Sequence, residues 1–167
     1  MTDITALSDP ALSASLSRYR LIIHDSPAIC DVLNFRGTEA LSQPFSWRIE
    51  FTSPQAHIRE SDLLMKFADF MLGDRKTVYG IVTGMEWLGT SADESRYSLT
   101  LESRLALLAH SRGCAVYQQL SVPEVVEQVL RRHGLEGPDF EFCLTHTYPP
   151  REVITQWRET DLQFIQR

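Results

Sequence analysis

The chain has 167 residues, 43% of them hydrophobic and 23% charged, which fits one packed domain and excludes a largely disordered protein. Acidic residues outnumber basic ones by 22 to 16, so the net charge is −6, and no basic run occurs. This charge argues against a nucleic-acid-binding protein, and no apolar run approaches the roughly 18 residues that a membrane-spanning segment needs.

The first residues and the cysteines indicate where the protein is made. The start of the chain has no basic n-region and no long apolar stretch, so it is not a secretory signal peptide. Cys30, Cys114 and Cys143 are odd in number and far apart, as in proteins whose thiols stay reduced. We expect synthesis in the cytoplasm and, if the protein leaves the cell, export without a cleaved signal.

The first hundred residues predict a loose arm, 1–17, followed by an antiparallel meander of about six short strands. The alternation is clearest at Phe45, Trp47, Ile49 and Phe51, which share one face of a strand. The expected strands cover 18–24, 30–38, 41–53, 67–72, 77–89 and 96–103, with a helical turn near 63–66 and a tight turn at 73–76.

The second part of the chain contains one strong helix signal. Ser121 and Glu124 have the spacing of a capping box, an apolar stripe follows, and Gly134 provides a stop, so a helix is predicted over 122–133. Thr160 and Gln163 open another helix that is cut short at the last residue, as in a truncated piece of a longer protein. Strands are expected at 114–119 and 139–145, an extended connector at 148–153, and either a helical turn or a strand at 104–110.

Candidate catalytic and metal-binding residues are sparse. His24 and Asp25 are neighbours without a nucleophile motif, and nucleotide-binding and calcium-binding spacings do not occur. Cys143 and His146, with Glu141 nearby, leave a hydrolase or metal-binding barrel as an alternative, but a structural zinc site normally needs two ligand pairs. The residues therefore predict a barrel with a helix that packs against a partner, without catalytic residues, metal or cofactor.

The best candidates for an interface lie near the end of the sequence. Trp157 stands in a polar segment, as an anchor residue of a protein interface often does. A helix that is cut short should also expose part of its apolar face. The predicted interface residues are Trp157, Arg158, Asp161, Leu162, Phe164 and Ile165.

Six segments in this order resemble the N-terminal hub region of VgrG, the trimeric spike of bacterial type VI secretion, which is itself similar to hub proteins of contractile phage tails. The resemblance runs from about Tyr19 to Arg167, and its most specific part is the last segment. Met65 departs from it, since the family usually has glycine after the double leucine. The six segments are NFRGTEALSQPFSWRIEF, DLLMKFADFML, VYGIVTGMEWLG, YSLTLESRLALLAH, VYQQLSVPEVVEQVLRRHGL and YPPREVITQWRETDLQFIQR.

The resemblance implies a β-rich α+β fold: an antiparallel β-barrel of the phage tail hub type, with one packed helix and a truncated C-terminal helix. The implied domains are a hub barrel at 18–147, including helix 122–133, and a connector with the start of the next hub segment at 148–167.

The resemblance also implies a structural function and no enzyme activity. The expected partners are two further copies in a homotrimer, the tube protein Hcp, and an effector or tip protein bound through regions beyond this chain. The protein would be cytoplasmic before firing and then secreted through the type VI apparatus. A contractile phage tail hub is the alternative within the same class.

Overall fold

The computed structural model describes residues 18–73 and 76–167, so the predicted arm at 1–17 and part of the predicted turn at 73–76 lie outside the described residues. Two compact units divide the chain. The first holds the described residues up to Ala40 and Phe45–Ser103, and the second holds Leu41–Pro44 and Arg104–Arg167. The boundary between units therefore does not coincide with position 147, and the domain organisation suggested by the resemblance stays a prediction.

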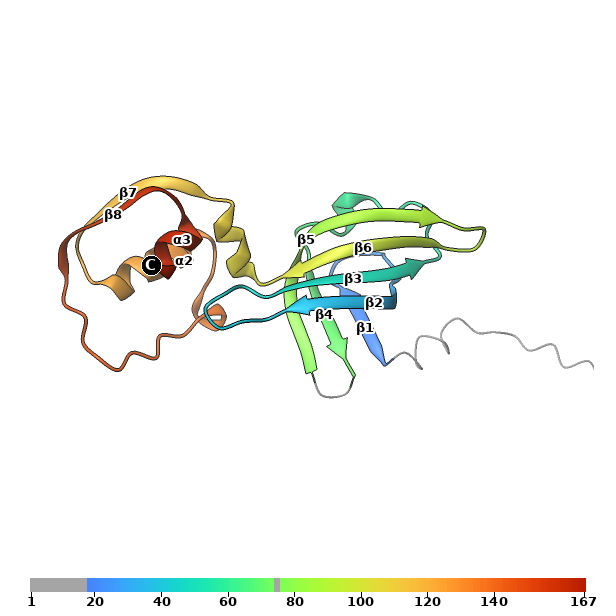
Figure 1. Ribbon diagram of the computed structural model, residues 1–167, viewed down its shortest axis with the longest axis horizontal. Coiled ribbons are helices and arrows are strands. Elements are labelled where there is room, and N and C mark those ends of the chain that lie inside the picture. Colours follow the sequence, from blue (N-terminus) through green and yellow to red (C-terminus); the bar gives the residue numbers. More distant parts are fainter. Residues whose placement is uncertain (1–17, 74–75) are drawn as a thin grey trace, which may run out of the picture. The chain divides into compact units, whose positions relative to one another are not determined.

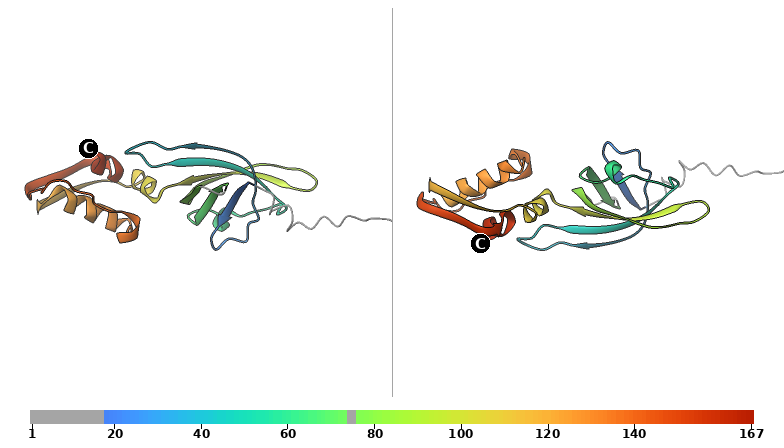
Figure 2. Two further views of the ribbon diagram at one scale, coloured as in Figure 1. Left: turned by 90° about the horizontal axis from the view of Figure 1, so that it is seen from below. Right: turned by 90° about the horizontal axis from the view of Figure 1, so that it is seen from above.

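Unit 1 is a six-stranded antiparallel sheet in the order β1-β4-β5-β6-β3-β2 (Figure 1). Its strands are β1 (Tyr19–Ile23), β2 (Asp31–Thr38), β3 (Ser46–Ser53), β4 (Phe67–Leu72), β5 (Lys76–Thr90) and β6 (Ser95–Glu102). Figure 2 shows β1 and β4 turning away from the plane of β2 and β3, so the sheet curls over its core. Rings of Tyr19 on β1 and Phe35 on β2 meet at 4.8 Å between their centroids, although these edge strands share no hydrogen-bond ladder.

The core of unit 1 follows from the alternation seen in the sequence. Ile49 and Phe51 on β3 are completely buried, and their neighbours Arg48 and Glu50 on the other face form ion pairs with side chains of β5 and β6. Phe51 stacks on Tyr97 of β6 at 5.6 Å between ring centroids. Because one face of each strand is apolar, curling the sheet buries all of these faces in one cluster.

Met65 lies on the short connection between the 3₁₀ turn η1 (Glu60–Asp62) and β4. Its φ is 60°, in the left-handed region where glycine has no steric cost, and its backbone N–H donates to Val82 O at 2.8 Å. This hydrogen bond holds Met65 in a backbone conformation that suits glycine better. Glycine is the residue expected at this position from the resemblance.

We expect Met65→Gly to raise the free energy of unfolding by about 0.5–1 kcal/mol, because relief of the left-handed strain exceeds the added chain entropy. The Met65 side chain is 59% exposed, so little packing is lost. Urea unfolding followed by circular dichroism measures the change. Met65→Ala keeps a Cβ and serves as control, with no gain expected; equal effects of both variants would contradict the strain argument.

Unit 2 consists of a two-stranded antiparallel ribbon, β7 (Arg112–Leu120) and β8 (Arg151–Thr160), with the helices α2 (Val122–Arg132) and α3 (Asp161–Gln166). Two 3₁₀ turns complete it, η2 (Arg104–Ala109) and η3 (Gly137–Asp139). The predicted helix at 122–133 is confirmed: the Glu124 carboxylate accepts from Ser121 N at 2.7 Å, and Gly134 has φ 72° after the last turn. The predicted cap of the last helix is confirmed too, because Thr160 Oγ1 accepts from Gln163 N.

Three local predictions were wrong. Residues 139–145 alternate in hydrophobicity but form no strand, since Phe142 and Leu144 are 37% and 51% exposed and no described strand pairs with them. The last half of the predicted connector, 151–153, and the polar segment around Trp157 are instead part of the strand β8. The strand expected from Leu41 begins at Ser46, because 41–44 form a turn in which Leu41 is 97% exposed.

Candidate interaction surface

The ribbon of β7 and β8 has an inner and an outer face, defined by its antiparallel register. Tyr117 pairs with Ile154 and Ala115 pairs with Gln156; these four side chains form the inner face, which is buried or half-buried. The ring of Tyr117 stacks on Phe164 of α3 at 5.8 Å between centroids. The inner face therefore contributes to the core of unit 2, together with Leu108 and the apolar stripe of α2.

At the polar end of this core, the buried carboxylate of Asp161 joins three elements of unit 2. Asp161 Oδ1 accepts from Arg132 at 2.9 Å and from Gln156 Nε2 at 2.7 Å, and Oδ2 lies 2.6 Å from His133 Nε2. Its backbone N–H donates to Ser111 O at 2.8 Å. Asp161 and Gln156 are each 1% exposed. Each polar atom of this carboxylate thus has a partner, as burial requires.

The partners of Asp161 determine its protonation. Burial by itself raises the pKa of this carboxyl group, but the hydrogen bonds from His133 and Gln156 and the charge of Arg132 together outweigh burial and hold the pKa at about 2, below the usual 3.8. Asp161 is therefore ionised at neutral pH. Its carboxylate binds Arg132 and His133 at the end of α2 and Gln156 of β8, and so connects both elements to α3.

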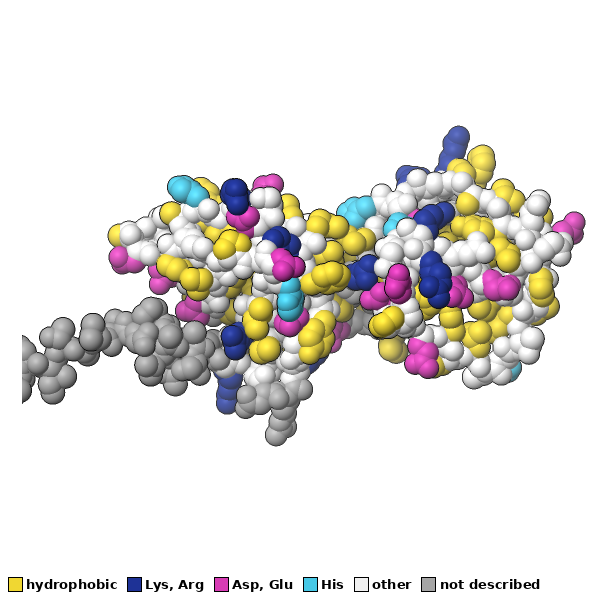
Figure 3. All heavy atoms as spheres, turned by 180° about the vertical axis from the view of Figure 1, so that it is seen from behind, with side chains coloured by type: hydrophobic (Ala, Val, Ile, Leu, Met, Phe, Trp, Pro, Cys, Tyr) yellow, Lys and Arg dark blue, Asp and Glu magenta, His cyan; other side chains and the backbone are white. Residues whose placement is uncertain are grey.

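The outer face of the ribbon is apolar and open. Its exposed apolar side chains are Val116, Val153 and Trp157, at 62%, 50% and 67%, and its other members are Cys114, Thr155 and the polar Gln118, which pairs with Val153. The structure leaves at least half of each of the Val116, Val153 and Trp157 side chains open to solvent. In the space-filling view of Figure 3, hydrophobic side chains reach the surface of both units between charges of both signs.

Arg158 fixes the position of Trp157 on this outer face. Its backbone has φ 49°, its N–H donates to Cys114 Sγ at 3.4 Å, and its carbonyl accepts from Arg112 Nε at 2.8 Å. The guanidinium of Arg158 lies 5.3 Å from the centre of the Trp157 ring. This bend of β8 places the indole and the guanidinium together at the surface, a pair that is enriched at the centres of protein interfaces.

The six predicted interface residues thus fall into two sets. Trp157 and Arg158 are exposed, and their role at an interface stays a prediction. Asp161 is the centre of the buried network, Phe164 is 7% exposed, and Leu162 and Ile165 pack partly against the core of unit 2. The inner face of the ribbon covers Phe164, so the exposed apolar surface expected of α3 does not include it, and an interface role for these four residues stays a prediction.

Sequence reasoning missed Val116 and Val153. The signal was present in Val153, Thr155 and Trp157, which alternate with Ile154 and Gln156. Gln156 conceals the pattern, because it is a polar residue on the buried face, where its side-chain amide donates to Asp161 and to Glu159 O.

The alternative site near Cys143 gains nothing from the structure. Cys143 is exposed on an irregular segment, and His133, a histidine upstream of it, contacts Asp161. Over residues 18–73 and 76–167, no group of three or more His, Cys, Asp or Glu side chains is arranged to hold a metal ion. In the same residues, no helix combines the length and the hydrophobicity that crossing a membrane requires.

Comparison with known protein families decides the identity of this fold. The profile of the family described as phage tail baseplate hub (GPD) matches residues 38–167. The chain belongs to this hub family. The fold predicted from the resemblance, a β-rich antiparallel hub fold, is confirmed by structural neighbours as a curled half-barrel with few helices.

Among the hub proteins, this chain is similar to spike proteins of type VI secretion, as the sequence predicted. It is 36% identical to the spike protein VgrG5 of Pseudomonas aeruginosa over 156 residues. This aligned region covers 92% of this chain and 20% of VgrG5. It is 31% identical to VgrG3 of Vibrio cholerae over 81% of this chain and 14% of VgrG3. The chain thus spans about a fifth or less of these relatives.

Solved structures agree. The E. coli c3393 protein, described as a component of the type VI secretion system with structural similarity to the T4 bacteriophage tail proteins gp27 and gp5, is 43% identical with a TM-score of 0.86, over 89% of this chain and 42% of that protein. A tail protein from Neisseria meningitidis shares 14% identity and a TM-score of 0.54 over 89% of this chain and 44% of that protein, which shows the fold alone.

Proposed function

We propose that this hub-family chain is a structural component of a type VI secretion spike. It would form the trimeric hub, dock on the Hcp tube and, through regions beyond the part matched here, carry an effector or tip protein. The similarity to the E. coli type VI component, 43% identity at a TM-score of 0.86, carries the proposal. Its function is mechanical: the packed sheet of unit 1 holds a shape, and no catalytic role is assigned to any residue.

The outer face of the β7–β8 ribbon supports an assembly role. Contiguous apolar side chains exposed to water are unfavourable in a protein that stays monomeric and are typical of a surface that contacts another chain. On this face they are Val116, Val153 and Trp157. We assign this face to contacts within the assembled spike. The protein would remain in the cytoplasm until firing and then leave through the apparatus without a signal peptide.

A phage tail hub is the second candidate within this family. The family match and the fold shared with phage-type tail proteins favour it, but those structures share 14% identity with this chain, against 43% for the type VI component. The difference in identity makes the secretion spike the better supported function.

Trp157→Asp in the chromosomal gene should abolish release of Hcp into the medium, because a charge would enter the proposed contact. The purified variant should unfold within about 0.5 kcal/mol of the original chain, since Trp157 is 67% exposed. Immunoblots of culture medium measure the release. Leu41→Asp, at a position 97% exposed in a turn, is the matched control and should leave release unchanged.

Two negative results have different meanings. If deletion of the gene leaves Hcp release intact in a strain without other spike genes, the proposed function is wrong. If deletion abolishes release and Trp157→Asp does not, the function stands and the assignment of the outer face is wrong.

A further inference from the structure

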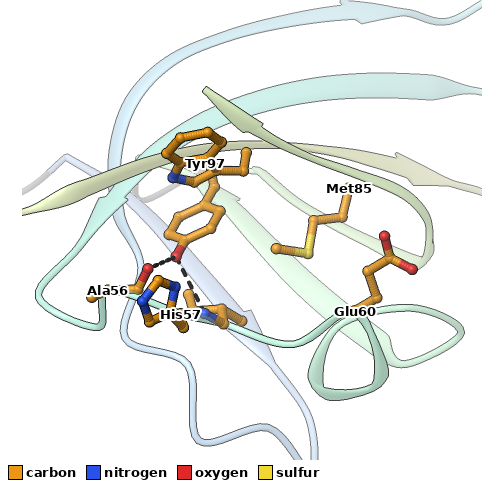
Figure 4. Close-up of a pocket in the computed structure, with 7 residues that line it drawn as sticks. Ala56, His57, Glu60, Met85 and Tyr97 are labelled. Atoms are coloured by element: carbon orange, nitrogen blue, oxygen red, sulfur yellow. Dashed lines mark hydrogen bonds between the residues drawn. The ribbon is translucent and has the colours of Figure 1, made fainter. Parts of the chain in front are cut away.

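Unit 1 contains a cavity of about 390 Å³ between the 56–60 segment and the strands β5 and β6 (Figure 4). Its lining includes Tyr97 and Met85 from the sheet, Ile58 from the segment, and the exposed Trp87, with His57 and Glu60 also contributing. The cavity lies at the small end of the range of about 300–1,000 Å³ found for ligand pockets. It is large enough for a side chain and small for a nucleotide cofactor.

The cavity is held open by a buried tyrosine. Tyr97 is 1% exposed; its hydroxyl donates to Ala56 O at 3.1 Å and accepts from Ile58 N at 3.2 Å, as the dashed lines of Figure 4 show. Phe51 stacks behind the Tyr97 ring. Both walls of the cavity are thus tied to the same buried ring, so a ligand meets a preformed site.

Trp87 differs from the other two tryptophans of the chain in what faces its ring. Lys76 Nζ lies 5.6 Å from the centre of the Trp47 ring, and the Arg158 guanidinium lies 5.3 Å from that of Trp157. Within the described residues no cation lies over Trp87, although its side chain is 61% exposed. Its indole Nε1 donates to Thr90 Oγ1 at 3.1 Å, which fixes the orientation of the ring.

Glu60 supplies a negative charge at the same cavity. Figure 4 shows Glu60 and Met85 on one side of the cavity, and Tyr97 with His57 on the other. The adjacent Arg59 binds Asp62 through two hydrogen bonds of 3.1 Å, and so does not neutralise Glu60. In the part of the chain that the structure describes, the Glu60 carboxylate has no hydrogen-bond or ion-pair partner.

We propose that this cavity binds an arginine side chain presented by a partner protein. The guanidinium would stack on the free face of Trp87 and pair with Glu60, while its methylene stem would contact Met85 and Ile58. Arginine fits better than lysine, because its planar group stacks on an aromatic ring and offers two parallel donors to a carboxylate. The site reproduces, between two chains, the cation–indole contact that Trp47 and Trp157 make within this one.

The test titrates the ¹⁵N-labelled 167-residue chain with the peptide acetyl-Gly-Arg-Gly-amide and follows the three indole N–H signals by NMR. We expect the Trp87 signal to move and the Trp157 signal to stay. A peptide with norleucine in place of arginine should bind at least about threefold more weakly, because it lacks the charge. Glu60→Gln should weaken arginine-peptide binding by about the same factor.

Glu94→Gln is the matched control, since it makes the same chemical change at an exposed carboxylate of unit 1 that does not line this cavity. It should leave the titration unchanged. The proposal is overturned if the Trp87 signal does not respond, if the norleucine peptide binds equally well, or if both variants reduce binding alike. Both substitutions are at exposed positions, and the amide spectrum of each variant reports whether the fold is intact.

Discussion

Replacing Phe51 with alanine should lower the free energy of unfolding of unit 1 by about 3–5 kcal/mol. Phe51 is completely buried, it stacks on Tyr97, and it lies on a central part of β3 paired on both sides. Removing the ring leaves a cavity that a six-stranded sheet cannot close without breaking its ladder. Amide hydrogen exchange measured by mass spectrometry should show lost protection in β3 and β6.

Phe51→Leu is the control for this variant. It keeps most of the apolar volume and should cost less than half as much. Protection in β7 and β8 of unit 2 should stay as it is in both variants. A loss of protection that is equal in both units would show that the two units unfold together, contrary to the division of the chain.

Asp161→Ala should destabilise unit 2 by about 2–4 kcal/mol, because it leaves His133 without its partner inside the protein and leaves Gln156 only its longer hydrogen bond to Glu159 O, at 3.3 Å. The lower limit of this range allows for Arg132, whose side chain is 49% exposed and can be hydrated by water once Asp161 is removed. Hydrogen exchange in β7 and β8 measures the effect. Glu127→Ala, which breaks the exposed ion pair with Arg131, is the control and should cost about 0.5 kcal/mol or less.

The pH dependence gives an independent check on Asp161. Since its folded pKa of about 2 is below the usual 3.8, its ionised form stabilises the fold above pH 4, and this contribution is lost as the pH falls toward 2. The difference in unfolding free energy between the original chain and Asp161→Asn should therefore shrink by on the order of 2 kcal/mol over that range. A difference that is constant with pH would contradict the assigned pKa.

Most strands of unit 1 could be predicted from the sequence, and the prediction was clearest where one buried and one wet face leave a period of two, as in β3 and in much of β6. The ribbon of unit 2 could not be predicted in full. Gln156 is a polar residue on the buried face, stabilised there by a hydrogen bond to Asp161, five positions later. Its polarity therefore makes the buried face of β8 look like the exposed one. The alternation at 139–145 misleads for the opposite reason. A segment with a period of two forms a strand only where another strand pairs with it, and none of the described strands pairs with 139–145.

The candidate surface shows the same limit. Trp157 could be chosen because an exposed tryptophan near polar residues is unusual, whereas Val116 and Val153 needed the register of β7 against β8. Asp161 was predicted as an interface residue from its place in the last of the six segments, whereas its partners Arg132 and His133 lie 29 and 28 positions earlier in the sequence. Only folding brings these charges together.

The position of β6 bears on how unit 1 would carry load. The last strand before the chain passes into Arg104–Arg167 is β6, which is hydrogen-bonded on one side to β3 and on the other to β5. The bonds of both ladders run perpendicular to the strand, so a pull along β6 strains them together, in shear. A pulled edge strand peeled sideways would instead break its bonds one after another. Attaching this exit to an inner strand therefore makes unit 1 resist tension along β6 as one plate.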